Sequence, residues 1–180
     1  RRLAGFGGRV LGQESPKYLN SPRTEAFDKG HILYALHLGK DDIKRLGVGV
    51  IVEGYMDAIA AHQHGFSNVV ASMGTALTQH QVDLLSGLAG DFILALDPDV
   101  AGQEATLRSL EGSWHAFEKK LVLRERGISF YERPRALSLK MAALPPGKDP
   151  DTVIKEDPGQ WEGVLAGAEP LMDYLMRVMA

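Results

Sequence analysis

A short apolar run that ends on a carboxylate and a glycine constrains this chain more than any other stretch. Val48 to Val52 is followed by Glu53, Gly54 and a helix-like segment, Tyr55 to His64. The run is too short and too β-branched for a helix, which favours a buried strand. Gly54 permits a sharp exit from that strand. We therefore expect Glu53 at the carboxyl end of a parallel strand, where open α/β sheets bind ligands.

A second predicted strand, Asp91 to Leu96, ends in the same way on Asp97, Pro98 and Asp99. If the two strands are neighbours, Glu53, Asp97 and Asp99 converge. Carboxylates that close together need protons or a divalent cation. A ligand set made only of oxygen atoms favours Mg²⁺ or Mn²⁺.

This arrangement, a Glu after one strand and an Asp-x-Asp after another, resembles the Toprim domain that topoisomerases and primases share. Among those families the chain is most similar to the bacterial DnaG-type DNA primases. The similarity rests on five motifs that follow one another in the expected order, at residues 5–11, 16–22, 53–57, 72–75 and 147–151. Any one of these motifs is weak evidence, but five in register are specific.

The resemblance implies an α/β fold: a Toprim (Rossmann-like) parallel sheet flanked by helices, with a small β-rich segment before it and a short helical segment after it. It implies metal-dependent nucleotidyl transfer, in which a primase synthesises RNA primers on single-stranded DNA during replication. Glu53, Asp97 and Asp99 would be the catalytic metal ligands, with Asp57, Asp149 and Asp151 as secondary candidates. The residues implied to bind the nucleotide are Lys17, Asn20 and Lys29.

The same resemblance implies partners. These are a single-stranded DNA template, nucleoside triphosphates and, through a region outside this chain, the replicative helicase of the primosome. Zinc would be bound only by a domain that this chain does not contain. Three positions depart from the family pattern: His31 replaces a frequent Arg, Pro98 a Gly and Val100 an Arg. The changes at Pro98 and Val100 bear on the efficiency of the chemistry more than on metal binding.

The distribution of charge follows the expected domains. The net charge is −3, but residues 1–45 hold nine Lys and Arg against five Asp and Glu, and the remainder holds eleven against eighteen. A basic segment beside an acidic site suits a polyanionic ligand. For the charge counts alone, a solvated surface with chance clustering is the better explanation. We expect a basic, β-rich part of the catalytic core at residues 1–46, a Toprim domain at 47–144 and a helical extension at 145–180.

Length and composition limit the alternatives. A chain of 180 residues suits one α/β domain with a small appendage. It has neither a long apolar run nor a signal-peptide pattern, so a cytoplasmic protein without a membrane partner is expected. No cysteine is present, which excludes disulfides and thiolate zinc sites. The chain starts in the middle of a motif and without methionine, which we interpret as a fragment of a longer protein.

Several further elements are predicted along the chain. We expect a glycine-rich strand pair or bulged ribbon within residues 3–11, an extended segment at 16–22, a strand at 68–71 and further strands at 128–131 and 139–144. The segment 32–38 is ambiguous between helix and strand. Helices are expected at 41–46, capped by Asp41 or Asp42, at 78–87, at 107–121 and, on either side of Pro170, within 159–179. Capping alone would explain Asp99, and it would also explain Asp149 before Pro150.

Three other functions stay open at this point. A Toprim nuclease or topoisomerase would use the same acids. A phosphatase of haloacid-dehalogenase type also has an Asp-x-Asp strand end, but its nucleophilic strand normally comes first in the domain. A non-catalytic module that binds metal or nucleic acid is the third. The chain lacks a Gly-x-Ser-x-Gly elbow and a Walker loop, which argues against acyl transfer and P-loop hydrolysis.

Overall fold

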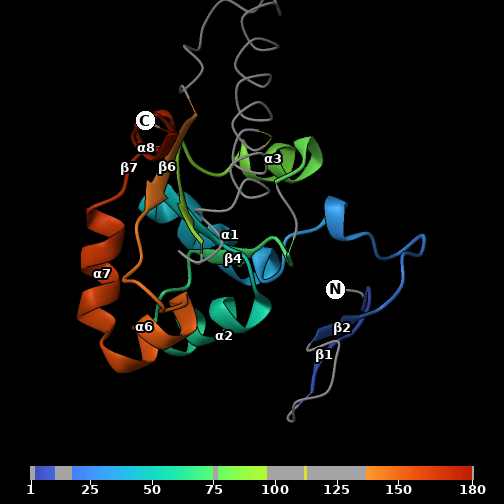
Figure 1. The fold of residues 1–180 in the computed structure, drawn as a ribbon. Helices are drawn as coiled ribbons and strands as arrows, with labels where there is room; N and C mark the ends of the chain where they lie inside the picture. Colours follow the sequence, from blue (N-terminus) through green and yellow to red (C-terminus); the bar gives the residue numbers. More distant parts are fainter. Residues whose placement is uncertain (1–2, 11–17, 75–76, 97–111, 113–136, 180) are drawn as a thin grey trace, which may run out of the picture.

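A five-stranded sheet forms the centre of the molecule in this computed structural model, which describes residues 3–10, 18–74, 77–96, 112 and 137–179. The strand order is β4-β3-β5-β6-β7 (Figure 1). The strands are β3 Val48–Val52, β4 Val69–Ala71, β5 Asp91–Ala95, β6 Ser138–Ala142 and β7 Glu169–Pro170. The first four are parallel to one another, and β7 adds an antiparallel edge. The predicted parallel sheet is confirmed, with this edge strand as an addition.

The register aligns the carboxyl ends of the parallel strands. Val52 pairs with Ala71 on one side and with Ala95 on the other, and Ala95 pairs with Ala142. Whatever follows β3 and β5 in sequence therefore starts from the same edge of the sheet.

Helices cover both faces of the sheet. They are α1 Leu36–Leu46, α2 Tyr55–Gln63, α3 Gln79–Leu85, α6 Pro150–Glu156, α7 Pro158–Ala166 and α8 Leu171–Met179. Successive strand residues point to opposite faces, so Ile51 and Leu94 pack with side chains of α1, α3 and α8, whereas Val50 and Ile93 pack with those of α2, α6 and α7. Burial on both faces explains why these strands are almost continuously apolar. In the described part of the chain, no helix is long and apolar enough to cross a membrane.

The N-terminal segment forms a separate two-stranded antiparallel sheet. Strand β1, Gly7–Arg9, pairs with β2, Tyr18–Asn20. A single 3-10 turn, η1, follows at Lys29–His31. Tyr34 then exchanges both backbone hydrogen bonds with Ala71 at 2.9 and 3.1 Å, which ties this segment to the edge strand β4.

Most predicted elements are confirmed. They include the strands beginning at residues 48 and 91, the helix after Gly54, and the helix capped by Thr78, whose hydroxyl accepts from the Gln81 N–H. Asp149 caps α6 with Pro150 in its first turn, as expected. Two helices flank Pro170, which itself lies in β7. The predicted helix at 107–121 and the predicted strand at 128–131 lie outside the described residues.

Two predictions about the N-terminal half are wrong. The first helix begins at Leu36 after Ala35, which has a φ of 64°, so neither Asp41 nor Asp42 caps it. Asp42 lies inside the helix, where it accepts a hydrogen bond from the Ser67 hydroxyl at 2.6 Å. Of the two alternatives for residues 3–11, the strand pair within that segment is also wrong, because β1 pairs with β2 instead. Neither long-range contact leaves a local pattern in the sequence.

Candidate functional site

Glu53 leaves the sheet at the carboxyl end of β3 and is held there by a turn from the next strand. The Ser72 N–H donates to the Val52 carbonyl at 3.1 Å, and the Gly74 N–H donates to the Glu53 carbonyl at 3.2 Å. Met73 and Gly74 both have positive φ, 62° and 76°. A left-handed methionine costs roughly 1 kcal/mol, so this turn retains a strained backbone where it supports Glu53.

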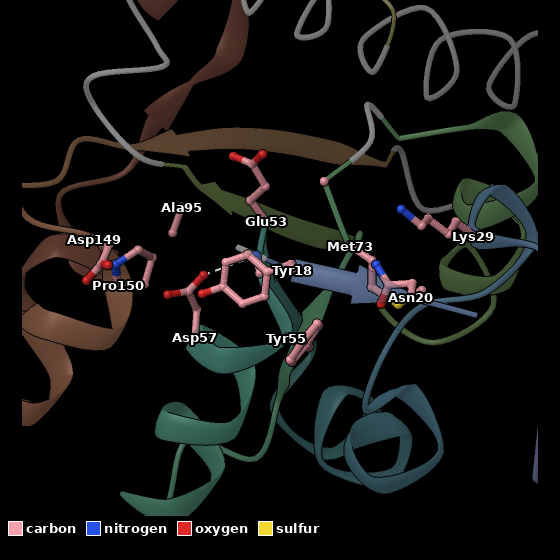
Figure 2. A pocket seen from close by; sticks show the side chains of 12 residues that line it. Tyr18, Asn20, Lys29, Glu53, Tyr55, Asp57, Met73, Ala95, Asp149 and Pro150 are labelled. Carbon is pink, nitrogen blue, oxygen red and sulfur yellow. Dashed lines mark hydrogen bonds between the residues drawn. The ribbon is translucent and has the colours of Figure 1, made fainter. Parts of the chain in front are cut away.

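A pocket of about 450 Å³ opens beside this strand end. Figure 2 shows Glu53, Asp57 and Asp149 on one side of it, and Asn20 and Lys29 on the other. The pocket therefore combines carboxylates from the sheet and its helices with an amide and an ammonium group from the N-terminal segment. The other described residues that line it are Tyr18, Gly54, Tyr55, Met73, Gly74, Ala95 and Pro150.

Asp57 is a carboxylate of the pocket that two N–H groups from distant parts of the chain hold. Its Oδ2 accepts from the Gly54 N–H at 3.1 Å, and its Oδ1 accepts from the Asp151 N–H at 3.2 Å. Burial raises the pKa of Asp57 to about 6, against the opposing effect of these two hydrogen bonds. A Cβ at Gly54 would lie 2.8 Å from Asp57 Oδ2, so a larger residue there would displace this carboxylate. Both Asp57 oxygens are thus engaged by backbone groups.

The two aspartates of α6 differ in their surroundings. Asp149 lines the pocket, and its Oδ1 accepts from the Thr152 N–H at 2.8 Å as the N-cap. Asp151 is not among the described lining residues, and it forms an ion pair with Lys155 at 2.8 Å. Of the secondary metal candidates, Asp57 and Asp149 therefore line the pocket, and Asp151 is outside its described lining.

An aromatic group that the sequence did not single out joins the N-terminal segment to the pocket. The Tyr55 ring lies edge-on to Tyr18, with centroids 5.5 Å apart, and 5.8 Å from the Tyr34 ring. Arg9 lies over Tyr18 at 5.6 Å. The Tyr55 hydroxyl is buried and has no hydrogen-bond partner among the residues that the structure describes, and burial raises its pKa. The only local sequence signal that Tyr55 joins the N-terminal segment to the pocket is its position as an aromatic residue directly after Glu53 and Gly54.

Three of the predicted site residues, Lys17, Asp97 and Asp99, lie outside the described residues. Strand β5 ends at Ala95, whose register partner in β3 is Val52. In sequence, Glu53 directly follows Val52, and Asp97 is the second residue after Ala95. Within the described ranges, no group of three acidic or histidine side chains is close enough to hold a metal ion. The donors present, the carboxylates of Glu53 and Asp149, are of the oxygen type that Mg²⁺ and Mn²⁺ prefer. They fit such an ion as part of a ligand set, not as the whole of it.

Comparisons with known proteins identify the family of this fold and pocket. Residues 47–125 match the family model of the Toprim domain, and residues 1–40 match that of the DNA primase catalytic core, N-terminal domain. The DNA primase of Deinococcus radiodurans is 44% identical over 180 residues, which cover 96% of this chain and 27% of the relative. The chain belongs to the DnaG-type primase family.

Solved structures agree with this membership of the DnaG-type family. The structure of the DnaG catalytic core superposes with a TM-score of 0.75 at 36% identity, covering 98% of this chain and 52% of that one. A DnaG primase catalytic domain bound to single-stranded DNA gives a TM-score of 0.73, also at 36% identity, covering 94% and 50%. The chain thus spans about a quarter of the curated relatives and about half of the solved catalytic domains.

Proposed function

We propose that this chain is part of the catalytic core of a DNA primase, which joins ribonucleotides into RNA primers on a single-stranded DNA template by metal-dependent nucleotidyl transfer. The observation that carries the proposal is the pocket itself. Glu53, Lys29 and Asn20 all line it, which supports a proposal in which one cavity binds a cation at the carboxylate and phosphate at the amide and ammonium groups. Membership of the DnaG-type family supports the same conclusion.

The proposed metal ligands are Glu53, Asp97 and Asp99, with Asp149 as a further ligand. Magnesium or manganese bound there would neutralise charge on the reacting phosphate and lower the pKa of the attacking hydroxyl. Asp57 has a supporting role, because its two oxygens are already held by the N–H groups of Gly54 and Asp151. It holds the N-terminus of α6, and with it Asp149, close to the end of β3.

The opposite side of the pocket binds the triphosphate in this proposal. Lys29 and Lys17 neutralise phosphate charge, and Asn20 donates a hydrogen bond to a phosphate oxygen. Residues 1–46 thus supply the nucleotide-binding groups, 47–144 the Toprim domain with its acids, and 145–180 the helical extension that carries Asp149. The helicase contact is assigned to a part of the protein outside residues 1–180.

Primer synthesis by the full-length protein tests this function. Wild type and Asp97→Ala are incubated with a single-stranded DNA template, labelled ribonucleotides and Mn²⁺, and the RNA products are separated on a gel. We expect template-dependent RNA from the wild type and at least a 100-fold loss in Asp97→Ala. An Asp91→Ala variant is the matched control, since Asp91 lies at the other end of β5. Equal RNA synthesis by wild type and Asp97→Ala would exclude the proposed site.

A further inference from the structure

The side chain of Gln81 connects the first turn of α3 to the segment that carries Lys29. Gln81 is completely buried. Its Oε1 accepts from the Thr78 N–H at 3.1 Å, while its Nε2 donates to the carbonyls of Lys29 and Ile32, both at 2.9 Å. The last two contacts join residues 52 and 49 positions apart. Both donors of the amide are thus used on the turn around Lys29.

Thr78 reinforces this connection. Its hydroxyl donates to the Gly30 carbonyl at 2.5 Å and accepts from the Gln81 N–H at 3.2 Å. Gly30 also lies next to the Thr78 side chain, because a Cβ at this position would be in van der Waals contact with the Thr78 methyl group, at 3.4 Å. Together, Gln81 and Thr78 hold three carbonyl groups of the four residues 29–32.

This connection fixes the backbone from which the Lys29 side chain reaches the pocket. Lys29 lines the pocket and, within the described part of the chain, forms no ion pair with an acid (Figure 2). Gln81 itself is not among the described lining residues. A long, flexible ammonium side chain gains binding strength when its backbone is held in advance, since less freedom is lost on binding.

We propose that Gln81 is a positioning residue for the triphosphate side of the pocket, acting through the backbone of Lys29 without touching the ligand. The proposal rests on the proposed function, in which Lys29 contacts the phosphates. The amide is specific for this task because it both accepts and donates, whereas ionised glutamate offers no donor to the two carbonyls and methionine offers no donor and only a weak acceptor.

A double-mutant cycle with MgATP as the probe tests this role in the 180-residue chain. Dissociation constants are measured for wild type, Lys29→Ala, Gln81→Met and the double variant, and the melting temperature of each is recorded. We expect Gln81→Met to weaken MgATP binding by about 3- to 10-fold in the wild-type background. In the Lys29→Ala background the same change should weaken binding by less than about 1.5-fold, because two residues that act as a unit have non-additive effects. Gln79→Met, the same change on the same helix at a residue whose amide bonds Asp83, should leave affinity unchanged.

The outcomes distinguish the phosphate contact of Lys29 from the positioning role of Gln81. If Lys29→Ala binds MgATP like the wild type, the proposed phosphate contact fails and the positioning role fails with it. If Lys29→Ala weakens binding but Gln81→Met has no effect, or has the same effect in both backgrounds, only the positioning role is overturned. Should Gln81→Met not fold, Thr78→Asp replaces it: aspartate still caps α3 but donates nothing to the Gly30 carbonyl. It should weaken MgATP binding only while Lys29 is present, and any other result overturns the proposal.

Discussion

The carboxylate of Asp57 and the backbone N–H of Asp151 form a 3.2 Å hydrogen bond across 94 residues of sequence. The other Asp57 oxygen accepts from Gly54 at the start of α2. One side chain therefore joins the N-termini of α2 and α6 at the edge of the pocket. Burial at this junction raises the pKa of Asp57, so the junction can be followed through the pH dependence of stability.

The stability of the protein should depend on pH through Asp57. Burial raises its pKa in the folded state from 3.8 to about 6, so the folded state binds this proton more tightly than the unfolded state. The free energy of unfolding should therefore fall as the pH rises from about 4 to about 6. A pKa change of this size corresponds to about 3 kcal/mol.

Urea unfolding at a series of pH values, with EDTA present, measures this effect. Asp57→Asn cannot ionise, so its free energy of unfolding should decline less over the same pH range. Asp173→Asn, at an exposed position of α8, controls for the loss of any carboxylate. Parallel pH profiles for wild type and Asp57→Asn would show that Asp57 titrates normally.

Metal binding should depend on the carboxyl end of β5 and not on its amino end. Asp97→Asn is expected to weaken Mn²⁺ binding by about 10-fold or more, because it removes a charged oxygen ligand from the proposed site. Asp91→Asn changes an exposed aspartate at the start of the same strand and should have little effect. Calorimetric titration of both variants decides the matter, and equal affinities would remove Asp97 from the metal site.

Nucleotide binding should depend on Lys17 and Lys29 and should weaken with salt. Each change to alanine removes a charge-assisted contact to phosphate, which corresponds to about 10-fold or more in affinity. Added salt screens the remaining attraction. MgATP affinity at 50 and 300 mM NaCl measures both effects, with Lys44→Ala on the exposed side of α1 as the control. Unchanged affinity in Lys17→Ala and Lys29→Ala would mean that the basic segment does not bind the phosphates.

Two glycine substitutions should change stability in opposite directions. A Cβ at Gly39 would lie 2.5 Å from the Ser67 carbonyl oxygen, so Gly39→Ala must push α1 away from the loop before β4 and should cost about 1–3 kcal/mol. At Gly163, in α7, a Cβ meets no atom within 4 Å, so Gly163→Ala should add about 0.5–1 kcal/mol. Urea unfolding of both variants gives the comparison. A stable Gly39→Ala variant would show that this contact relaxes easily.

Residues 1–180 alone should make little or no primer, although they fold. A template strand is gripped through several phosphates and stacked bases, whereas this chain has a net charge of −3 and its Trp161 is completely buried. Primer synthesis by the 180-residue chain, compared with the full-length protein on the same template with Mn²⁺, tests this. Strong template-dependent synthesis by the shorter chain would show that it grips the template unaided.

The elements next to the site could be predicted because their signals are local. An apolar β-branched run ending at Glu53 is visible in the sequence, and so is the capping pair of Thr78 and Gln81. Both predictions depend only on residues that neighbour one another along the chain, and the structure confirms the strand and the cap. The roles assigned to Glu53, Asp97 and Asp99 remain predictions.

The tertiary structure alone decided which distant residues meet at the pocket. No sequence period indicates that Gln81 bonds the carbonyl of Lys29, that Asp57 holds Asp151, or that Tyr34 pairs with Ala71. These contacts arise because the sheet register aligns the strand ends and because buried polar groups need partners wherever the packing brings one within reach. For the same reason the start of α1 was wrong in the sequence-based prediction: Ala35 is placed by the Tyr34 bridge to β4, not by a capping side chain.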